Sequence, residues 1–327
     1  MKILVTGGCG FVGCSIVPLL LENGYQIKIL DLLLFGEEPI ESFKDDVEII
    51  KEDIRNFNPS IFDDIDTVIH LAALSQPDEL KQIPQNLFYE INLNGSTRVA
   101  EYCKKAGVER LIFASTCSVY GYQKEVIYET TEPKPLEAYG DSKLKAEKEL
   151  LKLSDKDFCV TIMRPATMYG LSPKMRFDLV VNGMTYALYS TKEVNVMKPG
   201  TQWRPNIHVR DVGQAIRKIM EADKELVDKE IFNIGSNDQN YQIQTLAEEL
   251  ATTVLGEYNP KWYGQPDTRS YKVNFDKLRD TLGFKPNYTV SDAAKEITKA
   301  LESGQIEKTD KTINLNWYKL LVETKQI

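Results

Sequence analysis

The first half of the chain alternates short apolar runs with longer segments whose apolar residues recur every three or four positions. The runs predict strands, and the periodic segments predict amphipathic helices. The predicted strands are Lys2–Thr6, Gln26–Asp31, Val47–Lys51, Thr67–His70, Arg110–Ala114 and Val160–Arg164, and the predicted helices are 12–22, 86–105 and 140–153. Continuously apolar strands separated by helices predict an α/β fold with a doubly wound parallel sheet, covered by helices on both faces.

The pattern changes after residue 170, where Pro and Gly interrupt shorter elements. This change predicts a smaller, mixed α/β C-terminal domain. A helix over Arg210–Met220 and a strand over Glu230–Ile234 are nevertheless expected to return to the first sheet. The predicted division is therefore interleaved. Residues 1–170 with about 206–235 form the first domain, and about 171–205 with 236–327 form the second.

Composition narrows the possible functions. The 327 residues carry a formal net charge of −8, which disfavours binding to nucleic acid or to an anionic membrane. Apolar runs are too short for a transmembrane helix, and the first residues enter a strand pattern directly, so neither a membrane span nor a signal peptide is expected. Five cysteines without paired spacing favour a reduced, cytoplasmic protein, and two histidines make a metal site unexpected.

Glycines follow the first predicted strand in the run ILVTGGCGFVG, residues 3–13. Gly8, Gly10 and Gly13 fit a G-x-G-x-x-G spacing, and Gly7, Gly10 and Gly13 fit G-x-x-G-x-x-G. An ordinary glycine turn is the plain alternative. The preceding strand, the following helix and an acid at the end of the next strand instead favour a Rossmann-type dinucleotide site, in which bare backbone approaches a pyrophosphate.

That acid is Asp31, which lies 18 residues beyond Gly13. A carboxylate there suits a free ribose 2′-hydroxyl and repels a 2′-phosphate, and no Lys or Arg occurs in residues 32–35. The expected cofactor is therefore NAD rather than NADP. Asp53 ends the third strand and would accept a hydrogen bond from the adenine amino group, or would be a solvated turn acid.

Tyr139 and Lys143 are spaced i and i+4 near a predicted helix start, so they share a helical face. A lysine beside a tyrosine favours the phenolate form. Lowering a phenol pKa from ~10 to ~7 requires roughly 4 kcal/mol of preferential stabilisation. The resulting phenolate would serve as a general base near neutral pH. Alone, this spacing is also ordinary surface helix sequence.

The chain resembles the extended short-chain dehydrogenases/reductases that act on nucleotide sugars. The resemblance spans nearly the whole chain and rests on TGGCGFVG (6–13), Asp53-Ile54, HLAA (70–73), Asn92-Leu-Asn-Gly95, STCSVYG (115–121), Tyr139 with Lys143, Arg164-Pro165 with Gly170, and IHVRD (207–211). It implies that Tyr139 removes a sugar hydroxyl proton while hydride passes to NAD, that Thr116 hydrogen-bonds this hydroxyl, and that Lys143 holds the nicotinamide ribose.

The resemblance also implies the wider sites. The expected cofactor residues are Gly7, Gly10, Phe11, Val12, Gly13, Asp31, Asp53, Ile54, Leu71, Ala72, Ala73, Asn92, Tyr139 and Lys143. The expected nucleotide-diphosphate-sugar residues are Ser75, Thr116, Thr167, Asn182, Arg204 and Arg269. The first domain would then bind NAD and the second the sugar nucleotide. A homodimer formed through helices 86–105 and 140–153, which carry Leu87, Ile91, Leu144 and Leu151, is expected as well.

The stretch ASTCSVYG, residues 114–121, bears on the reaction type. Similar dehydratases and decarboxylases place carboxylates after the threonine, whereas this chain has Cys117 and Ser118. Hydride chemistry alone remains, which favours a 4-epimerase acting through a transient 4-keto sugar. The alternative is a 4-dehydrogenase or 4-ketoreductase, because Thr167 replaces a common asparagine and SPKMRFDLVVN (172–182) also resembles GDP-heptose 4-dehydrogenases. A non-catalytic NAD sensor is disfavoured by the intact Tyr139 and Lys143.

Overall fold

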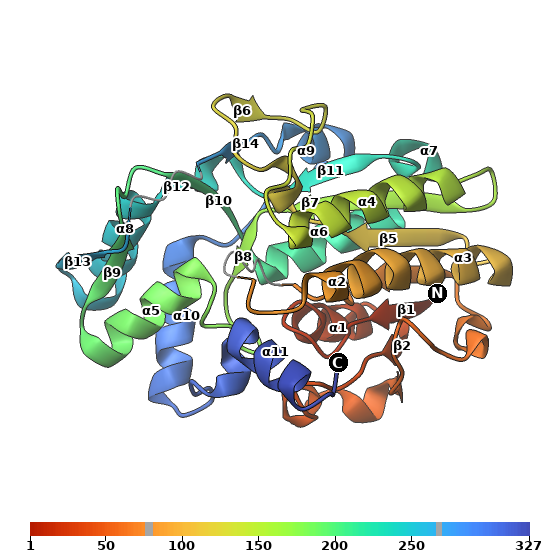
Figure 1. Ribbon diagram of the computed structural model, residues 1–327, viewed down its shortest axis with the longest axis horizontal. Coiled ribbons are helices and arrows are strands. Elements are labelled where there is room, and N and C mark those ends of the chain that lie inside the picture. Colours follow the sequence, from red (N-terminus) through yellow and green to blue (C-terminus); the bar gives the residue numbers. More distant parts are fainter. Residues whose placement is uncertain (76–80, 266–269) are drawn as a thin grey trace.

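A computed structural model describes residues 1–75, 81–265 and 270–327. Its centre is a seven-stranded sheet in the order β11-β7-β5-β4-β1-β2-β3, with every neighbouring pair parallel (Figure 1). The strands are β1 (Lys2–Thr6), β2 (Gln26–Leu30), β3 (Glu48–Ile50), β4 (Thr67–His70), β5 (Arg110–Ala114), β7 (Cys159–Pro165) and β11 (Ile231–Ile234). Strand order reverses between β1 and β4, and the crevice at such a reversal is where doubly wound sheets bind ligands.

The predicted Rossmann-type α/β class is confirmed. The strands β1, β4 and β5 have the predicted bounds, and the other predicted strands differ by a few residues at their ends. β11 pairs with β7, so the strand expected over 230–234 does return to the first sheet. The residue limits of the two domains remain an interpretation.

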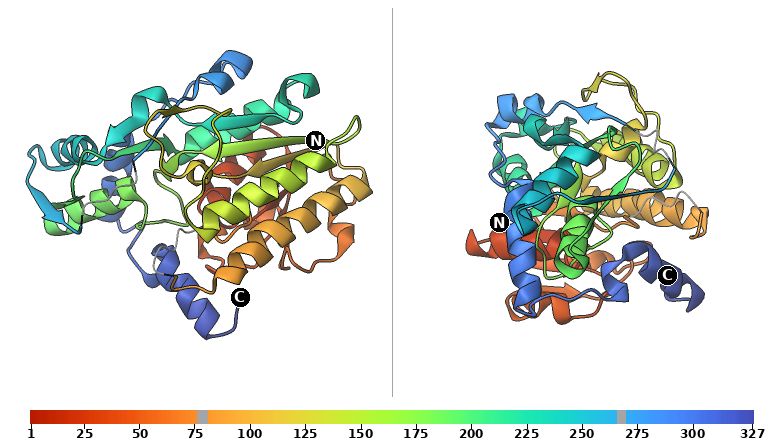
Figure 2. Two further views of the ribbon diagram at one scale, coloured as in Figure 1. Left: turned by 45° about the horizontal axis from the view of Figure 1, so that its top comes forward. Right: turned by 90° about the vertical axis from the view of Figure 1, so that its left-hand side faces the viewer.

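Helices cover both faces of this sheet. On one face, α1 (Gly13–Glu22) and α6 (Val209–Glu221) pack together over a hydrophobic cluster that includes Ile3, Val5 and Ile112. On the other face, α3 (Ser96–Ala106) and α4 (Ala138–Leu153) lie side by side (Figure 2, left). Side chains of both strand faces are therefore buried, which explains why the strands are apolar throughout rather than alternating.

The single helix predicted over 86–105 is divided. A short helix α2 (Gln85–Phe88) runs into a π-helical turn, Tyr89–Gly95, before α3 begins at Ser96. The wider turn carries Asn92, which is fully buried and bonds the backbone after β4. The periodicity of apolar residues does not reveal this change because the π-helical turn is a single local insertion within an otherwise helical segment.

Smaller sheets and a helical layer complete the fold, mostly from the C-terminal half of the chain. The additional strands are β6 (Val126–Ile127), β8 (Thr167–Tyr169), β9 (Val194–Met197), β10 (Trp203–His208), β12 (Asn240–Gln242), β13 (Pro260–Tyr263) and β14 (Lys272–Val273). The additional helices are α5 (Val180–Thr191), α7 (Lys224–Val227), α8 (Ile243–Leu255), α9 (Asp276–Leu282), α10 (Val290–Glu302) and α11 (Asn314–Glu323). Helices α5, α8 and α10 enclose a separate hydrophobic cluster, consistent with a mixed second domain.

The last helix, α11, leaves this layer and lies against the first domain (Figures 1 and 2). Tyr318 and Leu321 join a hydrophobic cluster with Leu74, Leu87 and Phe88. The indole N–H of Trp317 donates to the carbonyl of Leu34 at 2.8 Å. The C-terminus therefore returns to the sheet crevice, although the predicted division assigns it wholly to the second domain.

The apolar residues expected at a dimer interface are largely used within the chain. Leu87 and Leu144 are each 8% exposed, and Ile91 and Leu151 pack against hydrophobic clusters of the same chain. These side chains cover the chain's own core, so they do not support the homodimer. The homodimer stays a prediction. Among the described helices, none is long and apolar enough to cross a membrane.

A buried ion pair joins the helix α4 to the strand β7. The Arg164 guanidinium donates to the Glu147 carboxylate at 3.0 and 2.6 Å, and both side chains are nearly inaccessible to solvent. Ser115 hydrogen-bonds the same carboxylate, and Arg164 also donates to Tyr120 at 2.9 Å. This network fixes the helix α4 over the ends of β5 and β7.

We expect Glu147→Ala to lower the free energy of unfolding by about 3–5 kcal/mol, because it leaves the Arg164 charge buried without its carboxylate. Glu149→Ala is the matched control, since Glu149 pairs with Lys152 on the exposed face of the same helix. That change should cost at most about 1 kcal/mol. Urea denaturation measures both, and equal losses would contradict the assigned role of the buried pair.

Candidate functional site

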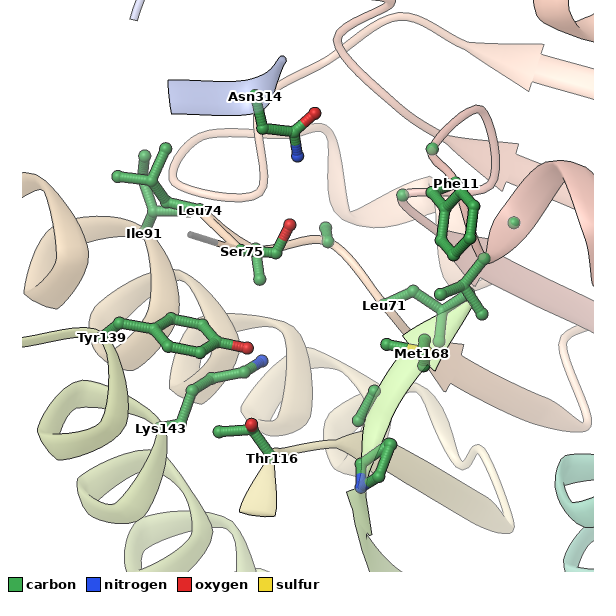
Figure 3. A pocket seen from close by; sticks show the side chains of 18 of the residues that line it. Phe11, Leu71, Leu74, Ser75, Ile91, Thr116, Tyr139, Lys143, Met168 and Asn314 are labelled. Atoms are coloured by element: carbon green, nitrogen blue, oxygen red, sulfur yellow. The ribbon is translucent and has the colours of Figure 1, made fainter. Parts of the chain in front are cut away.

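A cavity of about 300 Å³ lies at the carboxyl ends of the parallel strands (Figure 3). Its wall begins at the glycine loop after β1 and continues over the ends of β2, β4, β5 and β7. The strand β8 and the helix α11 close the opposite side. The cavity thus occupies the crevice that the strand order predicts, and both halves of the chain contribute to it.

The glycine loop is close-packed except on the side of the cavity. A Cβ on Gly7, whose φ is +70°, would lie 2.6 Å from the Ala72 nitrogen, and one on Gly13 would lie 2.3 Å from the Gly8 oxygen. Gly8 itself packs against Ile29 and does not line the cavity. The lining glycines are Gly7, Gly10 and Gly13, so the G-x-x-G-x-x-G spacing describes the loop.

Gly10 differs from the other two lining glycines because a Cβ there would approach only the Gly7 oxygen, at 3.3 Å. The space beside it belongs to the cavity, next to the first turn of α1. Helix N-termini with bare backbone attract phosphate groups. The loop therefore fits the pyrophosphate of a dinucleotide, with Phe11 and Val12 also on the cavity wall.

Asp31 follows β2 and is fixed by the backbone around it. Its carboxylate accepts hydrogen bonds from the Cys9 N–H at 3.0 Å and the Leu33 N–H at 2.8 Å. Burial raises the pKa of Asp31, and these N–H groups oppose the increase. The side chain lines the cavity, as expected for a ribose-binding acid.

Asp53 also lines the cavity, and its carboxylate pairs with the Arg55 guanidinium at 2.9 and 2.6 Å. It is therefore ion-paired rather than simply solvated. The apolar neighbours expected along the cofactor also lie on the wall: Ile54, Leu71, Ala72 and Ala73. Among the expected cofactor residues, all except Asn92 line the cavity.

Asn92 lies behind the wall rather than in it. Its side-chain oxygen accepts from the Leu74 N–H at 2.8 Å, and its NH₂ group donates to the Leu74 carbonyl at 3.3 Å and to Ser142 at 3.2 Å. The amide therefore ties the segment after β4 to the helix α4. Asn92 thus holds two parts of the wall together, and its expected contact with the cofactor stays a prediction.

Three polar side chains meet on the floor of the cavity: Tyr139, Lys143 and Thr116 (Figure 3). Tyr139 and Lys143 extend from the same face of α4, and Thr116 follows the end of β5. The Thr116 hydroxyl accepts the Ser118 N–H at 3.1 Å, which caps the short 3₁₀ helix Cys117–Tyr120. Its own proton remains available to a neighbouring oxygen.

Lys143 is buried with its amine directed toward the cavity (Figure 3). The nitrogen lies 4.3 Å above the Phe113 ring and has no hydrogen-bond partner among the described residues. Burial lowers the pKa of Lys143 to about 7, and the Glu147 carboxylate opposes this change. A buried donor without an acceptor fits a site completed by ribose hydroxyls of a bound dinucleotide.

Burial raises the pKa of Tyr139, while a hydrogen bond with Thr116 and the positive charge of Arg176 act in the opposite direction. The phenol is therefore protonated near neutral pH without a bound cofactor. A phenolate would require further positive charge in the cavity.

Neither of the two residues after Thr116, Cys117 and Ser118, carries a carboxylate. The Cys117 thiol donates to the Arg164 carbonyl at 3.1 Å, and burial raises its pKa well above that of a free thiol. Cys117 is thus a packed thiol rather than a nucleophile. The described acidic residues that line the cavity are Asp31, Glu52 and Asp53, all in segments after β2 and β3. At the end of the cavity that holds Tyr139, the wall has no carboxylate among the described residues.

The residues expected to bind the sugar nucleotide divide into groups. Ser75, Thr116 and Thr167 line the cavity. Asn182 does not, because its buried amide bonds Gly170 at 2.9 and 3.3 Å and the Arg176 carbonyl at 3.0 Å.

Of the two expected arginines, the structure describes only Arg204, and Arg204 does not line the cavity. Arg204 donates to the Trp203 carbonyl at 2.9 Å and lies over the Tyr271 ring, outside the lining set. Arg269 lies outside the described residues.

The structure adds wall residues that sequence reasoning missed, namely Lys174, Arg176, Asn314 and Tyr318. The first two lie in the run SPKMRFDLVVN, whose mixture of charged and apolar residues signals a special segment but not its orientation. Arg176 pairs with Asp178 at 2.8 Å and also donates to the Ser75 carbonyl at 3.3 Å. The helix carrying Asn314 and Tyr318 has an ordinary amphipathic sequence.

Comparison with known proteins identifies a family and relatives to which this chain is similar. The NAD dependent epimerase/dehydratase family matches residues 3–235. A "Putative UDP-glucose 4-epimerase" of Methanocaldococcus jannaschii is 29% identical over 311 residues, covering 90% of this chain and 96% of that protein.

Solved structures agree with this relationship. "MoeE5 in complex with UDP-glucuronic acid and NAD" is 26% identical with a TM-score of 0.80, covering 93% of this chain and 100% of that one. A UDP-glucuronic acid 4-epimerase from Bacillus cereus, in complex with NAD, is 25% identical with a TM-score of 0.80, covering 93% and 98%.

The glycine loop supports a prediction that separates folding from binding. In the absence of dinucleotide, Gly10→Ala should have nearly the same melting temperature as the parent protein, because the new methyl group enters the cavity. It should weaken NAD binding at least about tenfold, because the pyrophosphate loses its close approach to the backbone.

Gly13→Ala is the contrasting variant and should lose stability, since its Cβ would overlap the Gly8 backbone. Thermal melting and NAD titration measure both properties. Undiminished NAD affinity in Gly10→Ala would refute the placement of the pyrophosphate beside this loop.

Proposed function

Because the chain belongs to the NAD dependent epimerase/dehydratase family, we propose that it is a nucleotide-sugar 4-epimerase. The reaction would oxidise C4 of the sugar to a ketone and then reduce the ketone from its opposite face. Bound NAD supplies the hydride acceptor and, once reduced, the hydride donor. The chain itself positions the sugar and moves the hydroxyl proton.

The residues present fit NAD along its length. Asp31 offers a rigid carboxylate to a ribose hydroxyl, and the bare backbone at Gly10 offers room for the pyrophosphate. At the other end, Lys143 has an amine that lacks an acceptor among the described residues. The nicotinamide ribose would provide that acceptor, and the positive ring would lower the pKa of Tyr139.

In this proposal Tyr139 is the general base. Its phenolate would take the proton of the C4 hydroxyl as hydride leaves C4, and the resulting phenol would return that proton when hydride comes back. Thr116 would donate a hydrogen bond to the reacting oxygen. Lys143 would hold the cofactor ribose and, when protonated, stabilise the phenolate.

The observation that carries the choice of reaction is the chemistry of the segment after β5. Elimination and other proton removals from carbon need an additional base beside the keto sugar. Here Cys117 is turned to a backbone carbonyl and Ser118 is neutral, and the described acids of the wall lie in the segments after β2 and β3. A ketone formed in this cavity would therefore have hydride return as its main outcome.

Ser75 and Thr167 would hydrogen-bond the sugar, and Arg204, Arg269 and Asn182 were expected to contact the nucleotide. The described cavity supports the first two directly, whereas the buried amide of Asn182 supports an indirect role through the Gly170 backbone. The relatives act on or bind UDP-sugars, which makes UDP-hexoses and UDP-hexuronates the first substrates to test.

We expect Tyr139→Phe to reduce turnover by at least about a thousandfold while NAD binding remains close to normal, because only the proton acceptor is removed. Thr116→Ala should cost less, about ten- to a hundredfold, since one oriented hydrogen bond is lost. Steady-state kinetics and NAD titration measure these effects. Comparable turnover in Tyr139→Phe and the parent would exclude the phenol as the base.

The reaction itself is tested by incubating the NAD-loaded protein with UDP-, GDP-, dTDP- and CDP-sugars and identifying products by NMR. We expect one sugar to be converted to its C4 epimer, with all carbons and the C6 oxygen retained and no net NADH. A 4-keto-6-deoxy sugar or carbon dioxide would overturn the proposal. Stoichiometric NADH with a released ketone would instead establish the alternative, a 4-dehydrogenase.

A further inference from the structure

The helix α11 brings a side chain from the C-terminus to a buried lysine. The Asn314 side-chain oxygen hydrogen-bonds the Lys174 amine, and the Asn314 NH₂ group lies 3.4 Å from the Tyr318 hydroxyl. Lys174 and Asn314 are 3% and 2% exposed, and both line the cavity. Two segments separated by 140 residues thus meet at one point of the wall.

Lys174 lines the cavity close to the segment after β2 and to the first turn of α1. Its amine is 3.8 Å from the centre of the Phe35 ring, shortly after β2. Its backbone hydrogen-bonds the Cys14 thiol in the first turn of α1, and the neighbouring Ser172 donates to the Phe11 carbonyl at 2.8 Å. The segment carrying Lys174 therefore lies against the first turn of α1, beside the glycine loop to which the dinucleotide diphosphate is assigned.

A positive charge on Lys174 has little compensation among the described residues, which favours the neutral amine. No carboxylate among the described residues forms an ion pair with it, and the nearby Asp178 pairs with Arg176. Burial and the Arg176 charge lower the pKa of Lys174 to about 6. A neutral amide and an aromatic ring are weak partners for an ammonium group, whereas phosphate oxygens are strong ones.

We propose that Lys174 and Asn314 form a diphosphate-binding subsite through which the C-terminal helix holds the bound nucleotide. On ligand binding, the Lys174 amine would take up a proton from solvent and bond a phosphate oxygen as an ammonium group, while Asn314 keeps it oriented. The helix α11 would then close the cavity over the ligand, anchored by Trp317 and Tyr318. The family match ends at residue 235, so α11 lies outside the segment that defines the family.

Two diphosphates could occupy this subsite, that of NAD and that of the sugar nucleotide. The contacts with Phe35 and Cys14 favour NAD. Tight retention would suit an epimerase, which must keep its reduced cofactor until hydride returns. The inference thus rests on the proposed function for its ligand, but nucleotide exchange and binding are measurable without turnover.

The test compares variants of the NAD-loaded protein by the rate at which bound NAD exchanges with labelled NAD, and by calorimetric titration with UDP. We expect Lys174→Met to accelerate NAD exchange at least about tenfold, because a buried charge-assisted hydrogen bond is lost. Lys174→Arg should keep the rate within about threefold of the parent. Lys272→Met is the matched control, because Lys272 also lies over a ring, that of Trp203, but does not line the cavity.

Asn314→Asp distinguishes a ligand site from a purely structural contact. An aspartate would pair with Lys174 and compete with the diphosphate, so exchange should accelerate while the melting temperature of the nucleotide-free protein stays the same or rises. A structural clamp alone predicts unchanged exchange in this variant.

Weaker UDP binding with unchanged NAD exchange would assign the diphosphate to the sugar nucleotide and still support the subsite. Unchanged NAD exchange and unchanged UDP affinity in both Lys174→Met and Asn314→Asp would overturn it.

Discussion

Burying an amine without a hydrogen-bond acceptor is costly, and the site is organised around that constraint at Lys143. The helix α4 holds the Lys143 amine at the floor of the cavity. The Glu147–Arg164 ion pair fixes this helix to the ends of β5 and β7. Asn92 secures the other wall by tying the segment after β4 to Ser142. The protein thus maintains, through its own packing, a cavity that a ribose would complete.

The proposed reaction type rests on the residues that surround that floor. Strand ends place Thr116 beside Tyr139, while Cys117 faces a backbone carbonyl and Ser118 is uncharged. The same fold carries both epimerases and dehydratases, so the fold cannot choose between them. We base the choice on the cavity wall near Tyr139, where no carboxylate lies among the described residues. Hydride transfer is therefore the chemistry proposed for the site.

Local sequence patterns predicted the sheet, because each strand depends on neighbours within a few positions. The glycine loop, Asp31 and the floor residues were also singled out from local motifs, and the fold brings them to one cavity. The role expected for Asn182 stays a prediction, and the sequence does not reveal that its amide is bonded to the Gly170 backbone. Lys174 and Asn314 could not be paired from sequence, because a contact across 140 residues leaves no periodic signal. The π-helical turn that turns Asn92 inward is likewise invisible to apolar periodicity.

The central claim is that hydride leaves C4 and returns to the same carbon without leaving the protein. It is tested most directly with a nucleotide-sugar substrate deuterated at C4, followed by NMR of the product. The account predicts that the C4 epimer retains deuterium at C4. An epimer carrying hydrogen from solvent at C4, or deuterium recovered in released cofactor with an accumulating ketone, would contradict it.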